Sequence, residues 1–591
     1  MSLPIEDYAL ISDCRTGGLV GRNGNIEWLC LPRYDSASVF GALLGDEEHG
    51  HWLVAPTDPN ATATRHYVDR TFVLVTDWVT ATGELEVTDF MPHGDHLSNI
   101  VRRIQCVRGE VEVVEKLRMR FGYASALPWV RRVGTGDAEV LVAIAGPDAV
   151  VRRGPALTAG DLHHAATYAL TEGETIDVSL TWFRSHLEPP EAIDIEAAHR
   201  ETIRWWRDWA SRYSHEGPYY DHVMRSLLVL RALTDEATGG IVAAATTSLP
   251  EQFGGQRNWD YRFVWLRDAA LTLSAFLTHS YLSEAQSWRN WLLRTIAGDP
   301  ADIQTMYGLA GERYLPEREL DSLPGYQGAS PVRVGNAAVS QFQGDVIGEV
   351  MVALHEAREA GVTEDAFSWP LQQSLMSFVE EHWDDDDRGI WEIRGEPRAF
   401  THSRVMMWAA LDRAVRGVRE CGLEGPVERW EALRERVRDE IESKGFDASR
   451  NTYVQSYGST AVDASLLVLP QVGYCAADAP RMLGTVAAIE HDLLADGLLM
   501  RYRIDGGNDL DDFPPGEHPF LACSFWLVQQ YARSGRLDDA VALMDRLVGL
   551  TNDVGLLSEE YDTKGARHVG NTPQALTHLT MVQAADWIAR A

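Results

Sequence analysis

The sequence has 591 residues, of which 45 % are hydrophobic and 24 % are charged, and its formal net charge is −34. This length is sufficient for two or more domains, and the composition is that of an ordinary globular protein. So acidic a chain is poorly suited to nucleic acid or to an anionic membrane, because both partners require a basic surface. A neutral small molecule is compatible with this charge.

The six cysteines are widely spaced and lack the short spacings of a metal site, which predicts reduced, buried thiols. The N-terminal residues lack the basic and apolar regions of a secretory signal. No apolar run approaches the roughly 18 residues of a membrane helix. We therefore predict a cytoplasmic protein that contacts no membrane and uses no metal or cofactor.

Residues 1–190 have the pattern of short β-strands. Asn23-Gly24, a dipeptide typical of tight hairpin turns, separates two short apolar segments, and Thr82-Gly83 marks a second turn. Strand-like segments lie at 72–77, 84–90, 110–114, 139–144 and 175–183. Many short strands joined by glycine-rich turns predict an antiparallel β-sandwich.

The pattern changes after Pro189-Pro190, where residues 192–213 acquire helical spacing. This segment contains the cluster Trp205, Trp206 and Trp209. We predict a linker helix whose tryptophans pack between two domains, in preference to a shelf for a ligand.

From residue 218 to the end, apolar residues recur at helical spacing, most clearly on one face of the segment 342–354. The other helix-like segments are 223–233, 266–277, 367–379, 405–415, 426–441, 461–469, 520–531, 537–550 and 573–589. About a dozen helices without a short sequence repeat predict an α/α toroid.

Residues 257–268 read Arg-Asn-Trp-Asp-Tyr-Arg-Phe-Val-Trp-Leu-Arg-Asp. Rings such as Trp259 and Trp265 can pack against the apolar face of a sugar, while Arg267 and Asp268 can hydrogen-bond its hydroxyls. The residue types alone also allow an interlocked Arg–Asp cluster at a helix N-terminus. The segment resembles the signature of glycoside hydrolase family 15, the glucoamylase and trehalase family. This resemblance implies that Arg267 and Asp268 grip the terminal glucose.

The resemblance covers essentially the whole chain and implies its architecture. It implies an N-terminal antiparallel β-sandwich (1–190), a helical linker (191–217) and a catalytic (α/α)6 barrel (218–591). For the activity it implies an inverting, exo-acting α-glucoside hydrolase that releases β-glucose from the non-reducing end. Such a reaction requires a carboxylic acid that protonates the leaving oxygen and a carboxylate that activates water.

Glu392 is the candidate general acid. It lies between two helix-like segments, hence on a loop, where rigid helices can aim it. The residue types leave open a surface ion pair with Arg394. The dipeptide Trp391-Glu392 resembles the pair that carries the general acid of the family, which implies that Glu392 is the acid and that Trp391 lines the pocket.

Glu559 is the candidate general base. Two adjacent glutamates on a loop, Glu559 and Glu560, are more often solvated than catalytic. The surrounding Ser-Glu-Glu-Tyr-Asp nevertheless resembles the segment of the family in which the first glutamate is the base. The resemblance implies that Glu559 is the base and leaves Glu560 as the alternative base or a substrate contact.

Four further positions follow from the resemblance. Arg501 stands in an Arg-Tyr pair similar to one that faces the substrate, so a sugar contact is expected. Tyr326 and Arg333 lie in a segment similar to a loop of bacterial members, and both are expected to wall the pocket. Glu517 or His518 is expected either to reach the rim or only to cap a helix.

Two features concern the edges of the site. Ile393 stands where fungal glucoamylases carry a second acid that holds the sugar on the leaving-group side, so this subsite is expected to differ from theirs. The acidic run 384–387 could ligate a cation but lacks a calcium-loop pattern, and a solvated loop is expected.

Trehalose is the substrate that we expect, because the chain is predicted to be cytoplasmic, lacks a starch-binding module and departs from glucoamylases at Ile393. Hydrolysis of maltooligosaccharides or isomaltose is the close alternative. A disaccharide phosphorylase would use phosphate as nucleophile and would not need Glu559, and a non-catalytic sugar-binding protein would need neither glutamate motif. The sequence leaves the oligomeric state, including a homo-oligomer, open.

Overall fold

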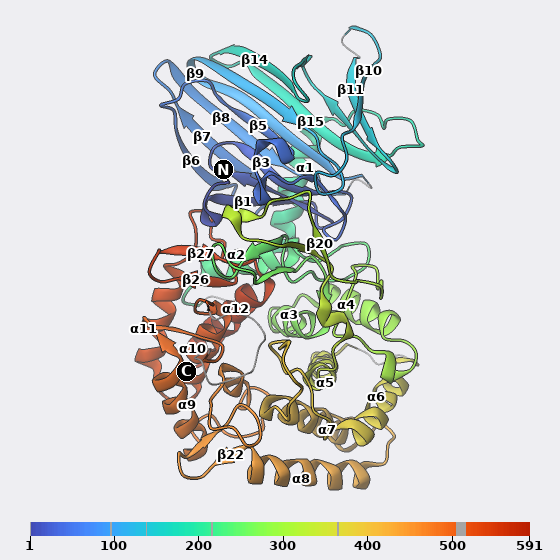
Figure 1. The fold of residues 1–591 in the computed structure, drawn as a ribbon, viewed down its shortest axis with the longest axis vertical. Helices are drawn as coiled ribbons and strands as arrows, with labels where there is room; N and C mark the ends of the chain where they lie inside the picture. Colours follow the sequence, from blue (N-terminus) through green and yellow to red (C-terminus); the bar gives the residue numbers. More distant parts are fainter. Residues whose placement is uncertain (1, 95–96, 137–138, 214–216, 363–365, 504–515) are drawn as a thin grey trace.

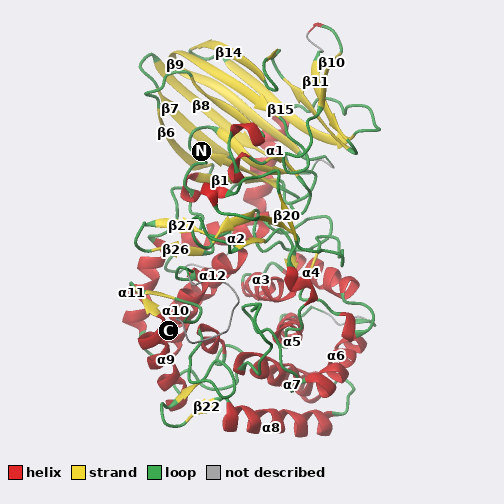
Figure 2. Cartoon of the chain, viewed as in Figure 1, coloured by secondary structure: helices red, strands yellow, loops and turns green. Residues whose placement is uncertain are grey.

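The structure is a computed structural model that describes residues 2–94, 97–136, 139–213, 217–362, 366–503 and 516–591. A β domain lies at one end of the molecule and a ring of helices at the other, connected by helix α1 (Ile195–Ala210) (Figures 1 and 2). The domain limits that we propose, at residues 190 and 217, fall just before and just after this helix.

The β domain consists of two antiparallel sheets that share the long strand β9 (Asn99–Arg118). The first half of β9 pairs with β8 (Gly83–Phe90) and β15 (Thr175–Arg184), and its second half pairs with β5 (His51–Pro56) and β14 (His164–Thr171). The predicted antiparallel β-sandwich is confirmed, with its two sheets continuous through β9.

The remaining strands extend both sheets. The sheet around β5 and β14 also contains β1 (Tyr8–Ser12), β2 (Gly17–Gly21), β3 (Asn25–Cys30), β4 (Ser38–Phe40) and β13 (Thr158–Ala159). The sheet around β8 and β15 also contains β6 (Thr62–Tyr67), β7 (Leu74–Val79), β10 (Trp129–Val133), β11 (Val140–Ala145) and β12 (Asp148–Arg153).

The hairpin predicted at Asn23-Gly24 joins β2 to β3. Gly24 has a φ of +78°, and a Cβ there would lie 2.2 Å from the carbonyl oxygen of Val54, so only glycine fits. The sequence predicted only residues 110–114 of β9. Buried ion pairs such as Arg102 Nε to Asp89 Oδ1, at 2.7 Å, place charged residues inside the sandwich. The alternation of apolar and polar residues that predicts a strand is therefore interrupted.

Helix α1 bridges the domains through its tryptophans, as predicted. The ring of Trp206 lies 5.3 Å from that of Phe72 in the β domain. The ring of Trp209 stacks at 4.2 Å on Tyr281 of the helical domain. The helix begins at a side-chain cap, where Asp194 accepts a hydrogen bond from the backbone N–H of Ala197.

The helical domain is an (α/α)6 barrel with an inner and an outer ring (Figure 1). The inner ring consists of α3 (Leu266–Thr278), α5 (Asp345–Glu359), α7 (Thr401–Cys421), the short 3-10 helix η8 (Ala464–Val468), α10 (Leu521–Arg533) and α12 (Ala575–Arg590). The outer ring consists of α4 (Leu282–Thr295), α6 (Ser368–His382), α8 (Val427–Lys444), α9 (Pro480–Leu493), α11 (Leu537–Val548) and α2 (Tyr220–Ala232).

Three helices differ from the prediction. The segment 461–469 forms only the five-residue η8, whose start is capped by Asp463. The sequence did not predict α4 and α9, both of which lie in the outer ring and begin without a side-chain cap. No helix in the described ranges is both long and apolar enough to cross a membrane.

Candidate active site

A pocket lies at the N-terminal ends of the inner helices. Trp265, Arg267 and Asp268 reach it from the start of α3, while Phe520 and Gln574 reach it from just before α10 and α12. The predicted residues Trp391, Glu392, Arg501 and Glu559 line the same pocket, which we call the Glu559 pocket. Segments up to about 330 residues apart in the sequence, from Ala243 to Leu576, therefore meet here.

A second, adjoining pocket shares Tyr261, Trp391, Glu392 and Arg501 with the first. We call it the Glu251 pocket. The residues found only in this pocket are Glu251, Arg257, Trp259, Asn336, Ala338, Gln341 and Arg394. Glu392 lines both pockets and therefore lies where they meet, whereas Glu559 lines only the Glu559 pocket.

Glu392 lies on a tight turn and has a φ of +58°, a conformation that non-glycine residues rarely adopt. Its Oε1 accepts a 2.6 Å hydrogen bond from Trp265 Nε1, and Arg267 Nη2 lies 3.5 Å from the same oxygen. Its Oε2 makes no hydrogen bond to any residue that the structure describes. Arg394, which the sequence offered as a surface partner, contacts Glu317 at 2.5 and 2.9 Å.

Arg267 and Asp268 are both interlocked and exposed to the pocket, so the two possibilities left open by the sequence coexist. Arg267 Nη1 lies 3.2 Å from Gln343 Oε1 and 3.3 Å from Asp345 Oδ2. Burial raises the pKa of Asp268 to about 6, and the positive charge of Arg267 opposes this rise. Fixed in this way, the pair offers a preorganised donor and acceptor to a ligand.

Glu559 is 1 % exposed, and its Oε1 accepts a 2.7 Å hydrogen bond from the Tyr261 hydroxyl. Burial raises the pKa of Glu559 to about 8; the nearby Glu251 also raises it, whereas Arg501 and the hydrogen bond from Tyr261 lower it. Gly570 (φ +79°) permits this close packing, because a Cβ there would lie 2.6 Å from Glu559 Oε2.

Glu560 does not line either pocket, which corrects its prediction as a substrate contact. It begins strand β26 (Glu560–Asp562), where successive side chains point to opposite sides. Its Oε2 accepts a 3.0 Å hydrogen bond from the backbone N–H of His518, and Arg501 lies 3.8 Å away. Of the two adjacent glutamates, Glu559 is the one that faces the pocket.

Arg501 is held by a buried carboxylate pair. Its Nη2 lies 3.2 Å from Glu251 Oε2 and 2.8 Å from Glu517 Oε1. Arg257 Nη1 lies 2.6 Å from the same oxygen of Glu517. Glu517 is therefore a buried residue that orients Arg501, and neither the rim position nor the helix cap expected for it is observed.

Trp259 lines the Glu251 pocket with part of its surface covered by guanidinium groups. The groups of Arg394 and Arg333 lie 4.3 and 4.9 Å from its ring centroid, and its Nε1 donates a 3.0 Å hydrogen bond to Glu251 Oε1. Arg333 itself does not line either pocket, because its Nη1 turns to the carbonyl oxygen of Gln256 at 2.7 Å. The prediction that Arg333 walls the pocket is therefore wrong. Its guanidinium group instead packs on the ring of Trp259, which does line the pocket.

The predicted place of Tyr326 in the pocket wall is also wrong. The Tyr326 side chain is fully buried, and its hydroxyl donates a 2.8 Å hydrogen bond to the carbonyl oxygen of Leu3 in the β domain. Tyr326 therefore lies where the two domains meet, because Arg567 Nη2 of the helical domain donates a 3.3 Å hydrogen bond to the same hydroxyl.

Among the lining residues that the sequence did not predict, Tyr261 contacts Glu559 and Glu251 contacts Arg501. Tyr261 stands inside the 257–268 motif, so the position of this polar ring between two predicted sugar contacts was a usable signal. Glu251 offers no such signal, because its importance depends on Arg501, which lies 250 residues away in the sequence.

Potential cation ligands lie away from the pocket. Among the described residues, His355, Glu359 and Glu420 are close enough together to hold a metal ion, but Arg416 contacts the two glutamates at 2.8 and 3.2 Å and already supplies positive charge. In the acidic run 384–387, Asp387 is buried and accepts a 2.7 Å hydrogen bond from the backbone N–H of Gly344 at the start of α5. The expected solvated loop is therefore wrong for Asp387.

The fold and pocket are those of an (α/α)6-barrel protein with facing carboxylates. A sequence profile described as glycosyl hydrolases family 15 matches residues 217–586, and one described as trehalase-like, N-terminal matches residues 1–155. The chain belongs to glycosyl hydrolase family 15.

Similar proteins cover the whole chain. The trehalase of Mycolicibacterium smegmatis is 36 % identical over 100 % of this chain and 92 % of its own length. The trehalase of Thermoplasma acidophilum is 35 % identical over 97 % of this chain and 98 % of its own length. A crystal structure of a bacterial glucoamylase complexed with acarbose has a TM-score of 0.75 at 12 % identity, covering 100 % of this chain and 96 % of that one, which supports the two-domain fold.

Proposed function

We propose that the protein is an inverting trehalase, which hydrolyses trehalose to one β-glucose and one α-glucose. The observation that carries this proposal is the placement of Glu392 and Glu559, which reach one cavity from separate loops and are held by separate hydrogen-bond donors. The full-length similarity to trehalases supports the choice of trehalose.

Glu559 acts as the general base. In its ionised form it takes a proton from a water molecule that attacks the anomeric carbon. The hydrogen bond from Tyr261 and the charge of Arg501 favour this ionised form, against the effect of burial. The glucose that is attacked occupies the Glu559 pocket, where Arg267, Asp268 and Arg501 hold its hydroxyls.

Glu392 acts as the general acid, because it lines both pockets and so stands where the bond between two sugars would cross from one to the other. Trp265 Nε1 fixes Oε1, which leaves Oε2 to carry the proton to the leaving oxygen. Inversion requires room for water, so we expect the two carboxylates to lie about 6.5–9.5 Å apart. Their donors, Tyr261 and Trp265, have ring centroids 5.5 Å apart.

The second glucose of trehalose leaves from the Glu251 pocket. Asn336, Gln341 and Arg394 give this pocket the polar lining that a sugar with several free hydroxyls requires. Ile393, which replaces the second acid of fungal glucoamylases, is 1 % exposed and packs against Phe400, so this position turns away from the leaving group.

Substrate binding widens the site. The Glu559 and Glu251 pockets measure about 50 and 40 Å³, much less than the roughly 300–1,000 Å³ of sites that enclose small ligands. We propose that the side chains at the junction, above all Trp391 and Glu392, move apart when the disaccharide enters. For the cellular location we propose the cytoplasm, a choice that the six free cysteines support.

Time-resolved proton NMR of the purified protein with trehalose tests the reaction. We expect equal initial amounts of α- and β-glucose without added phosphate, and slower release from maltose and isomaltose. Two α-glucose molecules per turnover would contradict inversion. Release of sugar phosphate only when phosphate is present would indicate a phosphorylase, and a strong preference for maltose or isomaltose would indicate a glucan α-glucosidase.

A further inference from the structure

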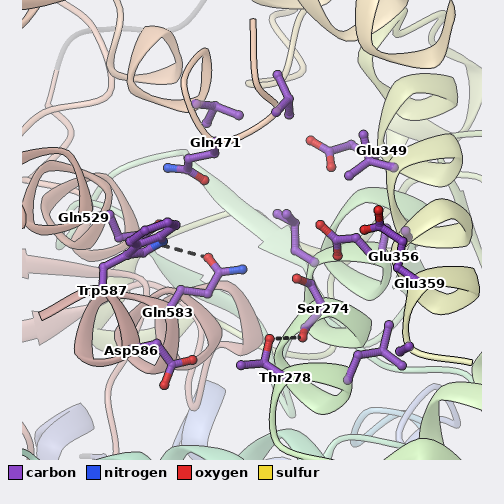
Figure 3. A pocket seen from close by; sticks show the side chains of 18 of the residues that line it. Ser274, Thr278, Glu349, Glu356, Glu359, Gln471, Gln529, Gln583, Asp586 and Trp587 are labelled. Carbon is purple, nitrogen blue, oxygen red and sulfur yellow. Dashed lines mark hydrogen bonds between the residues drawn. The ribbon is translucent and has the colours of Figure 1, made fainter. Parts of the chain in front are cut away.

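A separate cavity of about 390 Å³ lies at the opposite end of the barrel from Glu392 and Glu559. It is lined by residues of the inner helices α3, α5, α10 and α12, most of them in the C-terminal halves, and by the end of η8 and the segment that follows it. Figure 3 shows glutamates of α5 facing Gln471, Gln529 and Gln583 across this cavity. The reaction proposed above makes no use of it.

We call this cavity the rear cavity. Of the α5 residues that line it, Glu349 lies farthest from the C-terminal end of the helix. It is 3 % exposed, lines the cavity and makes no hydrogen bond to any residue within the described ranges. Burial raises its pKa to about 8, Asp345 and Glu356 raise it further, and Arg267 opposes them. A buried carboxyl group without a hydrogen-bond partner is costly, and a ligand that donates to it would remove that cost.

Glu356 lies two turns further along α5, on the same face and nearer the opening. Burial raises its pKa as well, while a hydrogen bond with Ser274 and the charge of Arg413 oppose this rise. Between the two carboxyl groups the wall is apolar, with Leu271, Val352 and Val468 among the lining residues.

The other charged groups of the rear cavity already have partners. Glu359 contacts Arg416 at 2.8 Å, and Asp586 contacts His279 at 3.1 Å. Arg533 and Arg590 lie over the ring of Trp587 at 4.5 and 5.3 Å, and Arg533 also donates a 2.8 Å hydrogen bond to the carbonyl oxygen of Pro470.

The helix ends add to the preference for positive charge. The C-termini of α3, α5, α10 and α12 lie at this mouth, and helix C-termini carry partial negative charge. Together with the net charge of −34, they favour a cation over an anion.

We propose that the rear cavity binds an aliphatic diammonium compound, with one ammonium group at Glu349, the other at Glu356, and the methylene chain along Leu271, Val352 and Val468. Seven helical residues separate the two glutamates by about 10 Å along the axis. With each ammonium about 2.8 Å from a carboxylate, about 4–5 Å remains between the two nitrogens, a distance that about three methylene groups span. This proposal does not depend on the proposed activity.

Isothermal titration calorimetry of the full-length protein with 1,3-diaminopropane tests the proposal. We expect saturable 1:1 binding that weakens with salt, together with at least ten-fold weaker binding of propylamine and no binding of 1,3-propanediol. Failure of the diamine to bind at millimolar concentration would overturn the proposal. Equal binding of the diol would also overturn it, because the site would then recognise a neutral polyol.

Variants locate the binding to this cavity. Glu349→Gln and Glu356→Gln should each weaken diamine binding at least ten-fold, whereas Glu359→Gln, at a glutamate already paired with Arg416, should change it less than three-fold. Val352→Trp should block binding by filling the cavity without removing charge, and circular dichroism verifies the fold of each variant. Unchanged affinity in both Glu349→Gln and Val352→Trp would place the diamine elsewhere and contradict the proposal.

Discussion

The two sides of the pocket hold their carboxylates in different ways. Glu392 lies on a short turn in the left-handed region, its side chain is 19 % exposed, and Trp265 and Arg267 contact it. Glu559 is 1 % exposed and belongs to a buried network that includes Glu251 and Arg501. The comparison suggests that geometry governs the acid side, whereas the surrounding charges govern the base side.

Replacing either carboxylate should have the largest effect. We expect Glu392→Gln and Glu559→Gln each to lower kcat for trehalose by roughly 10²–10⁴-fold, the usual contribution of general acid or base catalysis. The adjacent Glu560→Gln is the matched control, and it should lower kcat much less because Glu560 does not line the pocket.

α-Glucosyl fluoride distinguishes the two roles, because fluoride leaves without being protonated. Glu392→Gln should retain most of the activity towards this substrate, whereas Glu559→Gln should lose it, since the attacking water still requires a base. The assignment of acid and base would be reversed if Glu559→Gln alone retained fluoride hydrolysis. Steady-state fluoride release measures both variants.

Removing the hydrogen bond to the base should have the next largest effect. Tyr261→Phe deletes the 2.7 Å bond to Glu559 Oε1, and a hydrogen bond to a charged group contributes about 1.5–3 kcal/mol. We expect kcat to fall by roughly 10- to 100-fold, with Tyr314→Phe, at a tyrosine that is 88 % exposed, as control. Since this bond lowers the pKa of Glu559, the acid limb of the pH profile should also move to higher pH. An unchanged limb would mean that Tyr261 has only a structural role.

The sequence predicted the pocket residues best where a continuous motif lies at a helix start or on a loop beside the pocket. Arg267 and Asp268 at the start of α3, and Glu392 and Glu559 on loops, all line the Glu559 pocket as expected. The prediction failed for Tyr326 and Arg333, because a loop can belong to the site while individual side chains turn to the β domain or to a backbone carbonyl.

The charge network around the base lay beyond sequence reasoning. Arg501 and Glu517 lie 16 residues apart, whereas Glu251 lies 250 residues from Arg501. Only the contacts among these three residues reveal that they act together. The same limit applies to β9 and η8, where buried ion pairs and tertiary packing override the local hydrophobic period.

Changing the charge beside the base should move the pH profile in the direction opposite to Tyr261→Phe. The base must be ionised, so kcat/KM rises with pH through the pKa of Glu559, which is raised to about 8. Glu251 contributes to that rise, and Glu251→Gln should therefore shift the acid limb to lower pH. Glu319→Gln, at a mostly exposed glutamate, serves as control. A shift to higher pH, or none, would mean that Glu251 does not set the charge of the base.

The smallest effect on catalysis is expected at Tyr326, which tests whether the boundary of the site is drawn correctly. Tyr326→Phe removes the hydrogen bond to the carbonyl oxygen of Leu3 and the two that the hydroxyl accepts from Gln327 Nε2 and Arg567 Nη2. None of these three groups lines the Glu559 or Glu251 pocket, so kcat/KM for trehalose should stay within two-fold of the wild type. The free energy of unfolding should fall by about 1–3 kcal/mol, because three groups lose their partner at this hydroxyl, and urea denaturation can measure the change. A large loss of kcat/KM without a loss of stability would mean that contacts between the β domain and the barrel shape the pocket. The acid side and the base side could then not be understood without the β domain.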